Sequence, residues 1–400
     1  MKERRIFIVA GEASGDKHAA NLIRAMKTVM PGVRLEGLGG EDMQQAGCDL
    51  RADLVSVAVM GFIQVVGKLP FFRKLFSETV EYLKQTRPDA LVLVDYPGFN
   101  LRLAAAAKKL GVTVAYYISP QVWAWRPGRI HKIARLVDKM IVILPFEEEL
   151  YKKVNVDVTY VGHPLLDSFS ESRLDPDFLA GIDVPDPSAL IGLLPGSRRQ
   201  EIVAVLPALV ETARIIAKQT PQARFLIPCS SRGNMELIES ITANSGVSMK
   251  LLLGKVYEVA NACRCCIVGS GTATLEVAWF LTPLVVVYRT GYLAWLFGRK
   301  LLRVPHISLI NILAGREIVP EMLQRRMRPE LLAAKVAELS RDGEERRVMI
   351  EGLKSVRDKM GTPGASLRAA EAVRELIERQ TPAAANAALP EQRFVTADGR

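Results

Sequence analysis

The sequence is short of the residues that build disulfide frameworks and metal centres. Its 400 residues include five cysteines and four histidines. The cysteine number is odd, and Cys263, Cys265 and Cys266 lie too close together along the chain to suggest a disulfide framework. A metal site would need histidines nearby, and the nearest along the chain is His306. We therefore expect no metal and interpret the cysteines as small buried thiols.

Long hydrophobic runs are also missing. No stretch of eighteen apolar residues occurs, which argues against a membrane-spanning helix. The chain opens on basic residues, but its first apolar run stops after five residues, too few for a secretory signal. The sequence thus predicts a cytoplasmic protein, although such a protein can still lie on a membrane surface.

Acidic residues are outnumbered by basic ones. The chain has 53 Lys and Arg against 43 Asp and Glu, which gives a net charge of +10. This balance favours a polyanionic partner, and nucleic acid, nucleotide phosphates and an anionic membrane surface all fit it. Composition alone does not choose among the three.

Short apolar runs alternate with amphipathic helical patterns along most of the chain. Examples are "RIFIVA" and "ALVLVD" in the first half and "ALIGLLP" and "CCIVG" in the second. This alternation predicts an α/β fold with parallel sheets covered by helices on both faces. The length suits two domains. We therefore predict two doubly wound domains with a cleft between them.

Composition also predicts the domain boundaries. Residues 167–188 are rich in Pro, Asp and Ser and form a linker between a first domain, 1–166, and a second, 189–327. Residues 328–380 show helical patterns alone. Residues 381–400 lack periodicity and are expected to form a disordered tail.

In open parallel sheets ligands bind outside the carboxyl ends of the strands, so the loops after strands are the candidate sites. The first such loop, "GEASGD", contains Glu12, Ser14, Gly15 and Asp16. Its two carboxylates disfavour a phosphate, and its glycine spacing is not that of a dinucleotide fingerprint. A hydroxyl-rich ligand such as a sugar and a purely structural loop capped by Ser14 or Asp16 both remain open.

Two glycine-rich loops in the second half suit a nucleotide diphosphate. In "LLPGSRRQEI" the planar guanidinium of Arg198 can bind two phosphate oxygens beside exposed backbone N–H groups. In "GSGTATLEVAWF" a glycine turn opens a helix, and Glu276 could accept from a ribose diol. Such loops often contain glycine for structural reasons alone, but two in one half favour a diphosphate site. The residues expected to contact the donor are Gly196, Ser197, Arg198, Ser270, Gly271, Thr272 and Glu276.

The stretch "LVLVDYPGFN" places Asp95 at the end of a strand that is apolar on both faces. Asp95 either caps the helix that follows or lies at the mouth of a crevice as a general base. Tyr96 and Phe99 could partly desolvate its carboxyl group and raise its pKa. Asn100 beside this loop and His163 at the domain junction are further cleft candidates, although a structural histidine is the simpler interpretation of His163.

The segment 60–76 combines apolar and basic residues without an acid. That combination is typical of an interfacial segment or an acyl-chain pocket, although an ordinary core helix remains open. A second acid-free stretch, 277–316, strengthens the membrane interpretation. The residues expected at the lipid are Met60, Phe62, Val65, Val66, Leu69, Phe71, Phe72, Leu75 and Phe76.

Two tryptophans, Trp123 and Trp125, stand beside arginines in "SPQVWAWRPGRIHKI". Aromatic and arginine side chains together suit single-stranded nucleic acid, and tryptophan faces also stack on sugar rings. No RNA-binding signature accompanies them, so we expect no nucleic acid partner.

Eight of these stretches together resemble one family, the lipid-A-disaccharide synthases, which are inverting glycosyltransferases of outer-membrane lipid A synthesis. They are "GEASGD", "AVMGF", "SPQVWAWR", "LPFE", "VGHPL", "LLPGSR", "GSGTATLE" and "SLINILAGREIVPE", in order from Gly11 to Glu321. The resemblance covers most of the chain and implies a GT-B fold, in which two Rossmann-like domains face each other across the catalytic cleft.

The resemblance also implies a reaction. Family members join UDP-2,3-diacylglucosamine to 2,3-diacylglucosamine 1-phosphate, form a β-1,6 disaccharide and release UDP, with no cofactor or metal. Asp95 would be the base, Arg198 and the "GSGT" turn would stabilise the departing diphosphate, and Asn311 would contact the donor. Many relatives carry a second acid where this chain has Gly98, which weakens any mechanism that needs two carboxylates in this loop.

The family's members are peripheral membrane proteins, so the resemblance implies the anionic inner face of the cytoplasmic membrane as a partner. Family dimers exchange C-terminal helices, and here residues 328–380 either do so in a homodimer or pack back on the first domain. The alternatives are the UDP-GlcNAc transferase of lipid II synthesis, a UDP-sugar epimerase, and a membrane-bound nucleotide sensor that has lost catalysis. Intact Asp95 and Arg198 argue against the sensor.

Overall fold

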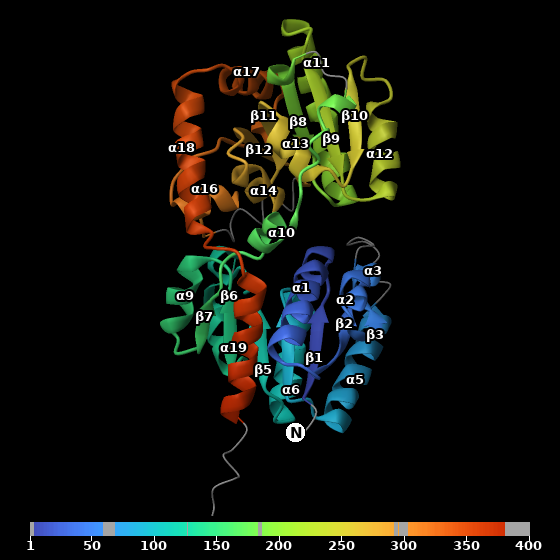
Figure 1. Cartoon of the computed structure of the whole chain (residues 1–400), viewed down its shortest axis with the longest axis vertical. Coiled ribbons are helices and arrows are strands. Elements are labelled where there is room, and N and C mark those ends of the chain that lie inside the picture. Colours follow the sequence, from blue (N-terminus) through green and yellow to red (C-terminus); the bar gives the residue numbers. More distant parts are fainter. Residues whose placement is uncertain are drawn as a thin grey trace, which may run out of the picture.

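The computed structural model describes residues 4–58, 69–125, 127–182, 186–291, 295 and 303–380, which form two parallel sheets (Figure 1). The seven-stranded sheet has the order β3-β2-β1-β4-β5-β6-β7, and the six-stranded sheet has the order β10-β9-β8-β11-β12-β13. In each sheet the strand order runs outward in one direction from the first strand of that half, β1 or β8, and then continues on its other side. This reversal is typical of doubly wound folds. The predicted fold class is confirmed.

The first sheet consists of β1 (Arg5–Ala10), β2 (Arg34–Gly39), β3 (Asp49–Asp53), β4 (Ala90–Val94), β5 (Val114–Tyr117), β6 (Lys139–Val142) and β7 (Val158–Tyr160). Its helices are α1 (Ala13–Val29), α2 (Glu41–Gln45), α3 (Leu54–Ala58), α5 (Leu69–Thr86), α6 (Pro97–Lys109), α7 (Val122–Trp125), α8 (Ile130–Leu136) and α9 (Pro145–Lys152). Every residue of β4 is buried, because helices cover the sheet on both faces and a continuous apolar run satisfies both.

The second sheet consists of β8 (Leu190–Leu194), β9 (Arg224–Cys229), β10 (Met249–Leu253), β11 (Cys265–Gly269), β12 (Leu284–Tyr288) and β13 (Glu321–Leu323). The helices after β7 are α10 (Leu165–Glu171), α11 (Arg199–Gln219), α12 (Arg232–Thr242), α13 (Val256–Ala262), α14 (Ala273–Trp279), α16 (Leu309–Ala314), α17 (Pro329–Ser340), α18 (Glu344–Lys359) and α19 (Ala365–Gln380). All five cysteines are free and buried, as expected.

The three C-terminal helices divide between the two sheets. Helix α17 packs on α11, and α18 packs on α14 and α16, whereas α19 crosses back and packs along α1 of the first half (Figure 1). The carboxylate of Asp167 in α10 fixes this crossing, because it accepts the backbone N–H groups of Gly364, Ala365 and Ser366 at 2.6 to 3.0 Å. Asp167 thus caps α19 from a distant part of the chain.

Within the described residues no helix is both long enough and apolar enough to cross a bilayer. The described part of the chain also contains no group of three or more His, Cys, Asp or Glu side chains placed to hold a metal ion.

Candidate active site

The carboxyl ends of the two sheets face each other, and an ion pair joins them. Glu12 follows β1 of the first sheet, and Arg198 follows β8 of the second. The Nη2 atom of Arg198 lies 2.8 Å from Oε2 of Glu12. Because ligands of parallel sheets bind at this edge, the region around the ion pair is the candidate site.

Asp95 enters this region from the end of β4 with an uncommon backbone. Asp95 and Tyr96 both have φ 45°, in the left-handed region that residues other than glycine seldom adopt. The Asp95 carbonyl is fixed by two donors, Nδ2 of Asn100 at 2.8 Å and the hydroxyl of Tyr116 at 2.5 Å. Helix α6 begins after Tyr96 without a side-chain cap, so the carboxylate of Asp95 does not cap it. This geometry leaves the carboxylate available for chemistry.

The first loop is shaped around the same turn. A Cβ atom at Gly11 would lie 2.2 Å from the ring of Tyr96, so a side chain at that position would displace the tyrosine. Glycine at 11 therefore allows the loops after β1 and β4 to touch. The contact brings the charge of Glu12 close to Asp95.

Burial raises the pKa of Asp95 to about 6, and the negative charge of Glu12 contributes in the same direction. The backbone N–H of Tyr96 and the positive charge of Arg198 oppose this rise. A carboxyl group with this pKa is ionised at neutral pH and is a stronger base than an ordinary aspartate.

Arg198 stands at the start of α11, where it contacts carboxylates from both halves. Besides Glu12 it pairs with Oε1 of Glu201 at 3.1 Å, and its side chain is 67% exposed. The turn before it depends on Gly196, whose φ is +118° and whose Cβ, if present, would lie 2.5 Å from Glu201. Ser197 uses its carbonyl to accept from Asn234 of α12 at 2.7 Å.

The second glycine loop lies against the first one. A Cβ atom at Gly269 would lie 3.0 Å from the carbonyl oxygen of Pro195, so the turns after β8 and β11 are adjacent. Gly271 is exposed, and Ser270 and Thr272 are partly exposed at the start of α14. Burial raises the pKa of Glu276 one turn later, and the positive charge of Lys17 from the first half opposes this. The structure thus brings together the two loops predicted to bind the diphosphate.

Four predicted site residues are used inside the protein. Asp16 is 3% exposed and accepts the backbone N–H groups of Gly40, Asp42 and Met43, so it caps α2 rather than α1. Its carboxylate is thus engaged with the backbone of α2, as in the structural alternative, and a ligand contact of Asp16 stays a prediction. Ser14 and Gly15 begin α1 beside it, and Ser14 is exposed.

Asn311, expected at the donor, has no exposed surface. Its amide donates to Val319 and Glu321 and accepts from Ile318 and Val319, which uses the whole group to hold the turn before β13. The amide is thus fully engaged within the protein, and the donor contact of Asn311 stays a prediction.

His163 and Asn100 are also buried. Nδ1 of His163 accepts from the backbone of Leu165 at 3.3 Å, and burial lowers the pKa of His163 to about 3, so the ring is neutral. His163 therefore has the surroundings of a structural histidine, the simpler of the two interpretations of its sequence context. Asn100 serves the site indirectly, because its amide holds the carbonyls of Val94 and Asp95.

The apolar segment is divided between core and surface. Met60, Phe62, Val65 and Val66 lie outside the described residues, as does the side chain of Leu69. Leu75 is 7% exposed and belongs to the core over the first sheet, so it cannot contact lipid in this conformation. Phe72 and Phe76 pack against that core, whereas Phe71 is 41% exposed.

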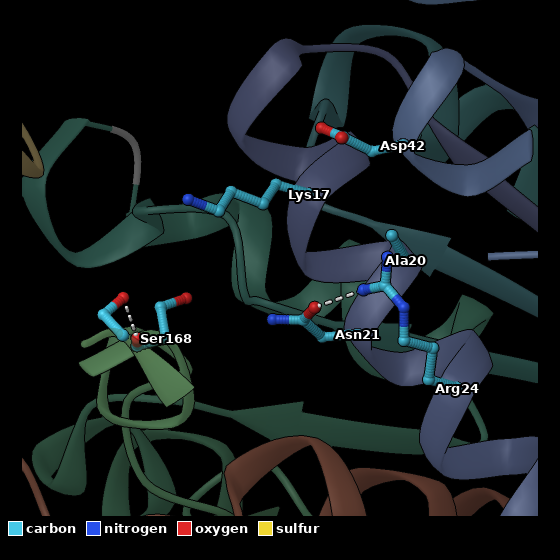
Figure 2. Close-up of a pocket in the computed structure, with 7 residues that line it drawn as sticks. Lys17, Ala20, Asn21, Arg24, Asp42 and Ser168 are labelled. Atoms are coloured by element: carbon cyan, nitrogen blue, oxygen red, sulfur yellow. Dashed lines mark hydrogen bonds between the residues drawn. The ribbon is translucent and has the colours of Figure 1, made fainter. Parts of the chain in front are cut away.

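Figure 2 shows a polar pocket of about 240 Å³ beside α1 and α10. It is lined by Lys17, Ala20, Asn21, Arg24, Asp42, Ser168 and Ser172. None of the predicted site residues lines it, and Arg24 already donates to Asn21 at 2.8 Å. This pocket is separate from the residues around Asp95 and Arg198.

Sequence reasoning missed the residues that hold the site in shape. Tyr116 fixes the carbonyl of Asp95 from the neighbouring strand β5, and Gly11 makes room for Tyr96. The available signal for Tyr116 was a tyrosine within an otherwise apolar strand, since a buried hydroxyl needs a hydrogen-bond partner.

The fold is that of the two-domain GT-B class. A UDP-GlcNAc 2-epimerase from Neisseria meningitidis bound to UDP-GlcNAc is similar over 94% of this chain and 100% of its own, with a TM-score of 0.64 at 13% identity. The calicheamicin glycosyltransferase CalG4 is similar over 96% of this chain and 100% of its own, with a TM-score of 0.60 at 14% identity. At these identities the likeness concerns the fold alone.

Sequence similarity gives the family. Residues 6–374 match the family described as lipid-A-disaccharide synthetase. The lipid-A-disaccharide synthases of Syntrophus aciditrophicus and Syntrophotalea carbinolica are 41% and 42% identical over 380 residues, which is 95% of this chain and 99% and 97% of theirs. The chain belongs to the lipid-A-disaccharide synthetase family and is a glycosyltransferase of lipid A biosynthesis. The expected resemblance is confirmed.

Proposed function

We propose that the protein transfers 2,3-diacylglucosamine from its UDP derivative to 2,3-diacylglucosamine 1-phosphate, with inversion at the anomeric carbon and without a metal. The observation that carries this proposal is the pairing of the two halves. A partly buried carboxylate with a raised pKa, Asp95, stands opposite an arginine and two glycine loops, with Glu12 and Arg198 in contact between them. Membership of the family supports the same substrates.

Asp95 acts as the general base in this mechanism. The hydroxyl of the acceptor attacks the anomeric carbon from the face opposite UDP, and Asp95 removes the hydroxyl proton as the new bond forms. Attack from the opposite face gives the β-1,6 disaccharide. The hydrogen bonds from Tyr116 and Asn100 to the Asp95 carbonyl hold the carboxylate in one direction, which favours a near-attack geometry.

Arg198 and the turn 269–272 stabilise the departing diphosphate. The guanidinium binds Glu12, and a bound diphosphate would compete for the same donors. The exposure of the Arg198 side chain leaves it free to make this exchange. The guanidinium of Arg198 and the backbone N–H groups of the turn then stabilise the negative charge that develops on the leaving UDP. In this mechanism they take the role that a metal ion has in other transferases.

The first half also serves as the membrane side in this proposal. Phe71 is exposed at the start of α5, next to Arg73 and Lys74 of the same acid-free segment. Acylated substrates lie in a bilayer, so a basic and apolar surface would hold the protein at the anionic inner face of the cytoplasmic membrane.

The test incubates the purified protein with the diacylated UDP-sugar and the diacylated sugar phosphate in the presence of EDTA. Mass spectrometry should detect UDP and a tetraacyl disaccharide 1-phosphate, and proton couplings in the product should show a β linkage. UDP-sugar consumed without disaccharide, or a rate abolished by EDTA and restored by a divalent cation, would contradict the proposal.

A further inference from the structure

The short helix α7 lies at the edge of the candidate site. It follows β5, and β5 pairs with β4 so that Tyr117 lies opposite Val94, the residue before Asp95. The segment that carries α7 therefore leaves the sheet beside the Asp95 turn. On its other side, the backbone N–H of Arg303 donates to the carbonyl of Ala124 at 2.9 Å, so the second half contacts α7 directly.

A buried carboxylate in α9 holds α7. Glu147 lies in the first turn of α9 and is 1% exposed. Its Oε1 accepts from the indole N–H of Trp123 in α7 at 3.1 Å, and its Oε2 accepts from the backbone of Leu144 at 3.2 Å. The indole ring packs edge-on against Phe146 at 5.1 Å between centroids. Two of the stretches that carried the family resemblance, "SPQVWAWR" and "LPFE", thus meet at this hydrogen bond.

Helix capping does not account for the burial of this carboxylate. An exposed glutamate could accept the Leu144 N–H at the start of α9 equally well, without the cost of burying a charge. Among the described residues no Lys, Arg or His forms an ion pair with Glu147. The carboxylate is instead met by the indole of Trp123, and the nearby hydroxyls of Ser119 and Tyr151 bond to each other at 2.7 Å. The side-chain partners of the carboxylate, Trp123 and Ser119, both belong to the segment after β5 that carries α7.

We propose that Glu147 is a positioning residue for the acceptor: through the indole of Trp123 it fixes α7 beside Asp95, where the acceptor sugar approaches the base. This inference rests on the proposed function. The acceptor, rather than the donor, is implicated because α7 belongs to the half that carries Asp95, whereas both loops suited to the diphosphate belong to the other half.

Ionisation of Glu147 strengthens the bond to Trp123. Burial raises the pKa of Glu147 to about 7, and the N–H groups of Trp123 and Leu144 oppose that rise. Tyr151 faces it from its own helix, and burial raises the pKa of that hydroxyl, while Ser119 faces it from the loop after β5 and donates to it. Near neutral pH the carboxyl group therefore exists in both forms, and the charged form accepts the indole N–H more strongly.

The experiment measures KM for acceptor and donor, and kcat, for four variants of the full chain. Glu147→Ala and Trp123→Phe each remove one side of the hydrogen bond, Glu147→Gln keeps an acceptor oxygen without the charge, and the double variant combines Glu147→Ala with Trp123→Phe. Glu148→Gln, on the same helix but paired at the surface with Lys152, is the matched control.

Each single loss should raise the acceptor KM about tenfold, as expected for one hydrogen bond to a charged group, with donor KM and kcat within about twofold of wild type. The double variant should be no worse than either single variant, because both remove the same bond. Glu147→Gln should recover most of the loss and abolish the change of acceptor KM between pH 6 and 8. Glu148→Gln should match wild type.

Additive effects of the two single variants, or equal increases in acceptor and donor KM, would overturn the proposal. A pH-dependent acceptor KM in Glu147→Gln equal to that of wild type would do so as well. If Glu147→Ala does not fold, the Trp123→Phe and Glu147→Gln measurements decide alone. Disaccharide formation by the wild type in the same assay separates failure of this inference from failure of the proposed function.

Discussion

The loops at the carboxyl ends of the two sheets are chemically opposite. Those of the first half present carboxylates, Glu12 after β1 and Asp95 after β4. Those of the second half present glycine turns and Arg198 after β8. An inverting transfer needs a proton acceptor on one face of the donor sugar and a positive environment on the other. A fold with two facing sheets allows each half to supply one of these.

The two halves also make their sharp turns differently. Gly196 in the second half has φ +118°, which glycine adopts at little cost. Asp95 and Tyr96 in the first half have φ 45°, which costs other residues about 1–3 kcal/mol each. The bonds from Tyr116 and Asn100 to the Asp95 carbonyl hold the strained turn. The strained turn therefore lies at the side chain that we propose as the base.

The largest effect should come from removing the charge on the first-half side. Asp95→Asn keeps the size of the side chain and the tolerance for a left-handed backbone, but an amide cannot accept the proton. We expect turnover, measured as UDP release, to fall about 10²–10⁴-fold with little change in melting temperature or UDP affinity.

The control for this variant is Asp49→Asn, which alters an exposed carboxylate on edge strand β3 of the same sheet. It should turn over at the wild-type rate. If Asp95→Asn did so as well, Asp95 would not be the base, and Glu12, whose charge acts on Asp95, would be the next candidate.

A smaller effect should come from the second-half side. Arg198→Lys keeps the positive charge but loses the planar fork. The loss of transition-state stabilisation should be about 2–4 kcal/mol, comparable to removal of one oxyanion donor. Stopped assays of kcat/KM measure it, and Arg199→Lys at the neighbouring exposed position is the control. Unchanged kinetics and UDP affinity in Arg198→Lys would place the guanidinium outside the site. The second half would then not supply the positive group that the comparison assigns to it.

The smallest effect concerns the exposed apolar and basic residues of α5 in the first half. Phe71→Ser removes an exposed ring, and loss of its burial in lipid should weaken binding to anionic vesicles about tenfold without lowering the melting temperature. Phe76→Ser is the comparison. The ring centroid of Phe76 lies 5.8 Å from that of Phe99, so this replacement should lower the melting temperature instead. Vesicle sedimentation in which Phe71→Ser binds like wild type would refute a lipid contact at this residue.

The sequence was sufficient to predict most of the architecture but not two of its edge strands. Buried strands such as β4 could be recognised because an apolar run satisfies two covered faces. The edge strands β3 and β13 could not, since "DLRAD" is half charged and "EML" has three residues. Their pairing with β2 and β12 depends on the rest of the sheet.

The candidate site also contains residues whose place could be predicted from the sequence and residues whose place could not. Asp95, Glu12 and Arg198 could be assigned to one cleft, because parallel strands bring the loops after them to one edge. The roles of Asp16 and Asn311 could not be foreseen, because their partners, the backbone of α2 and the turn before β13, are fixed by tertiary packing. A polar residue in a motif therefore does not by itself show whether it faces the ligand or the interior.

The central claim, that Asp95 is the base, is tested most directly by the pH dependence of turnover at saturating concentrations of both substrates, which removes any effect of Glu147 on acceptor binding. Since burial raises the pKa of Asp95 to about 6 and only the ionised form accepts a proton, the rate should fall tenfold per unit below pH 6 and become constant above it. The residual rate of Asp95→Asn should lack this limb. A wild-type rate that is constant from pH 5 to 8, or the same limb in Asp95→Asn, would contradict the account.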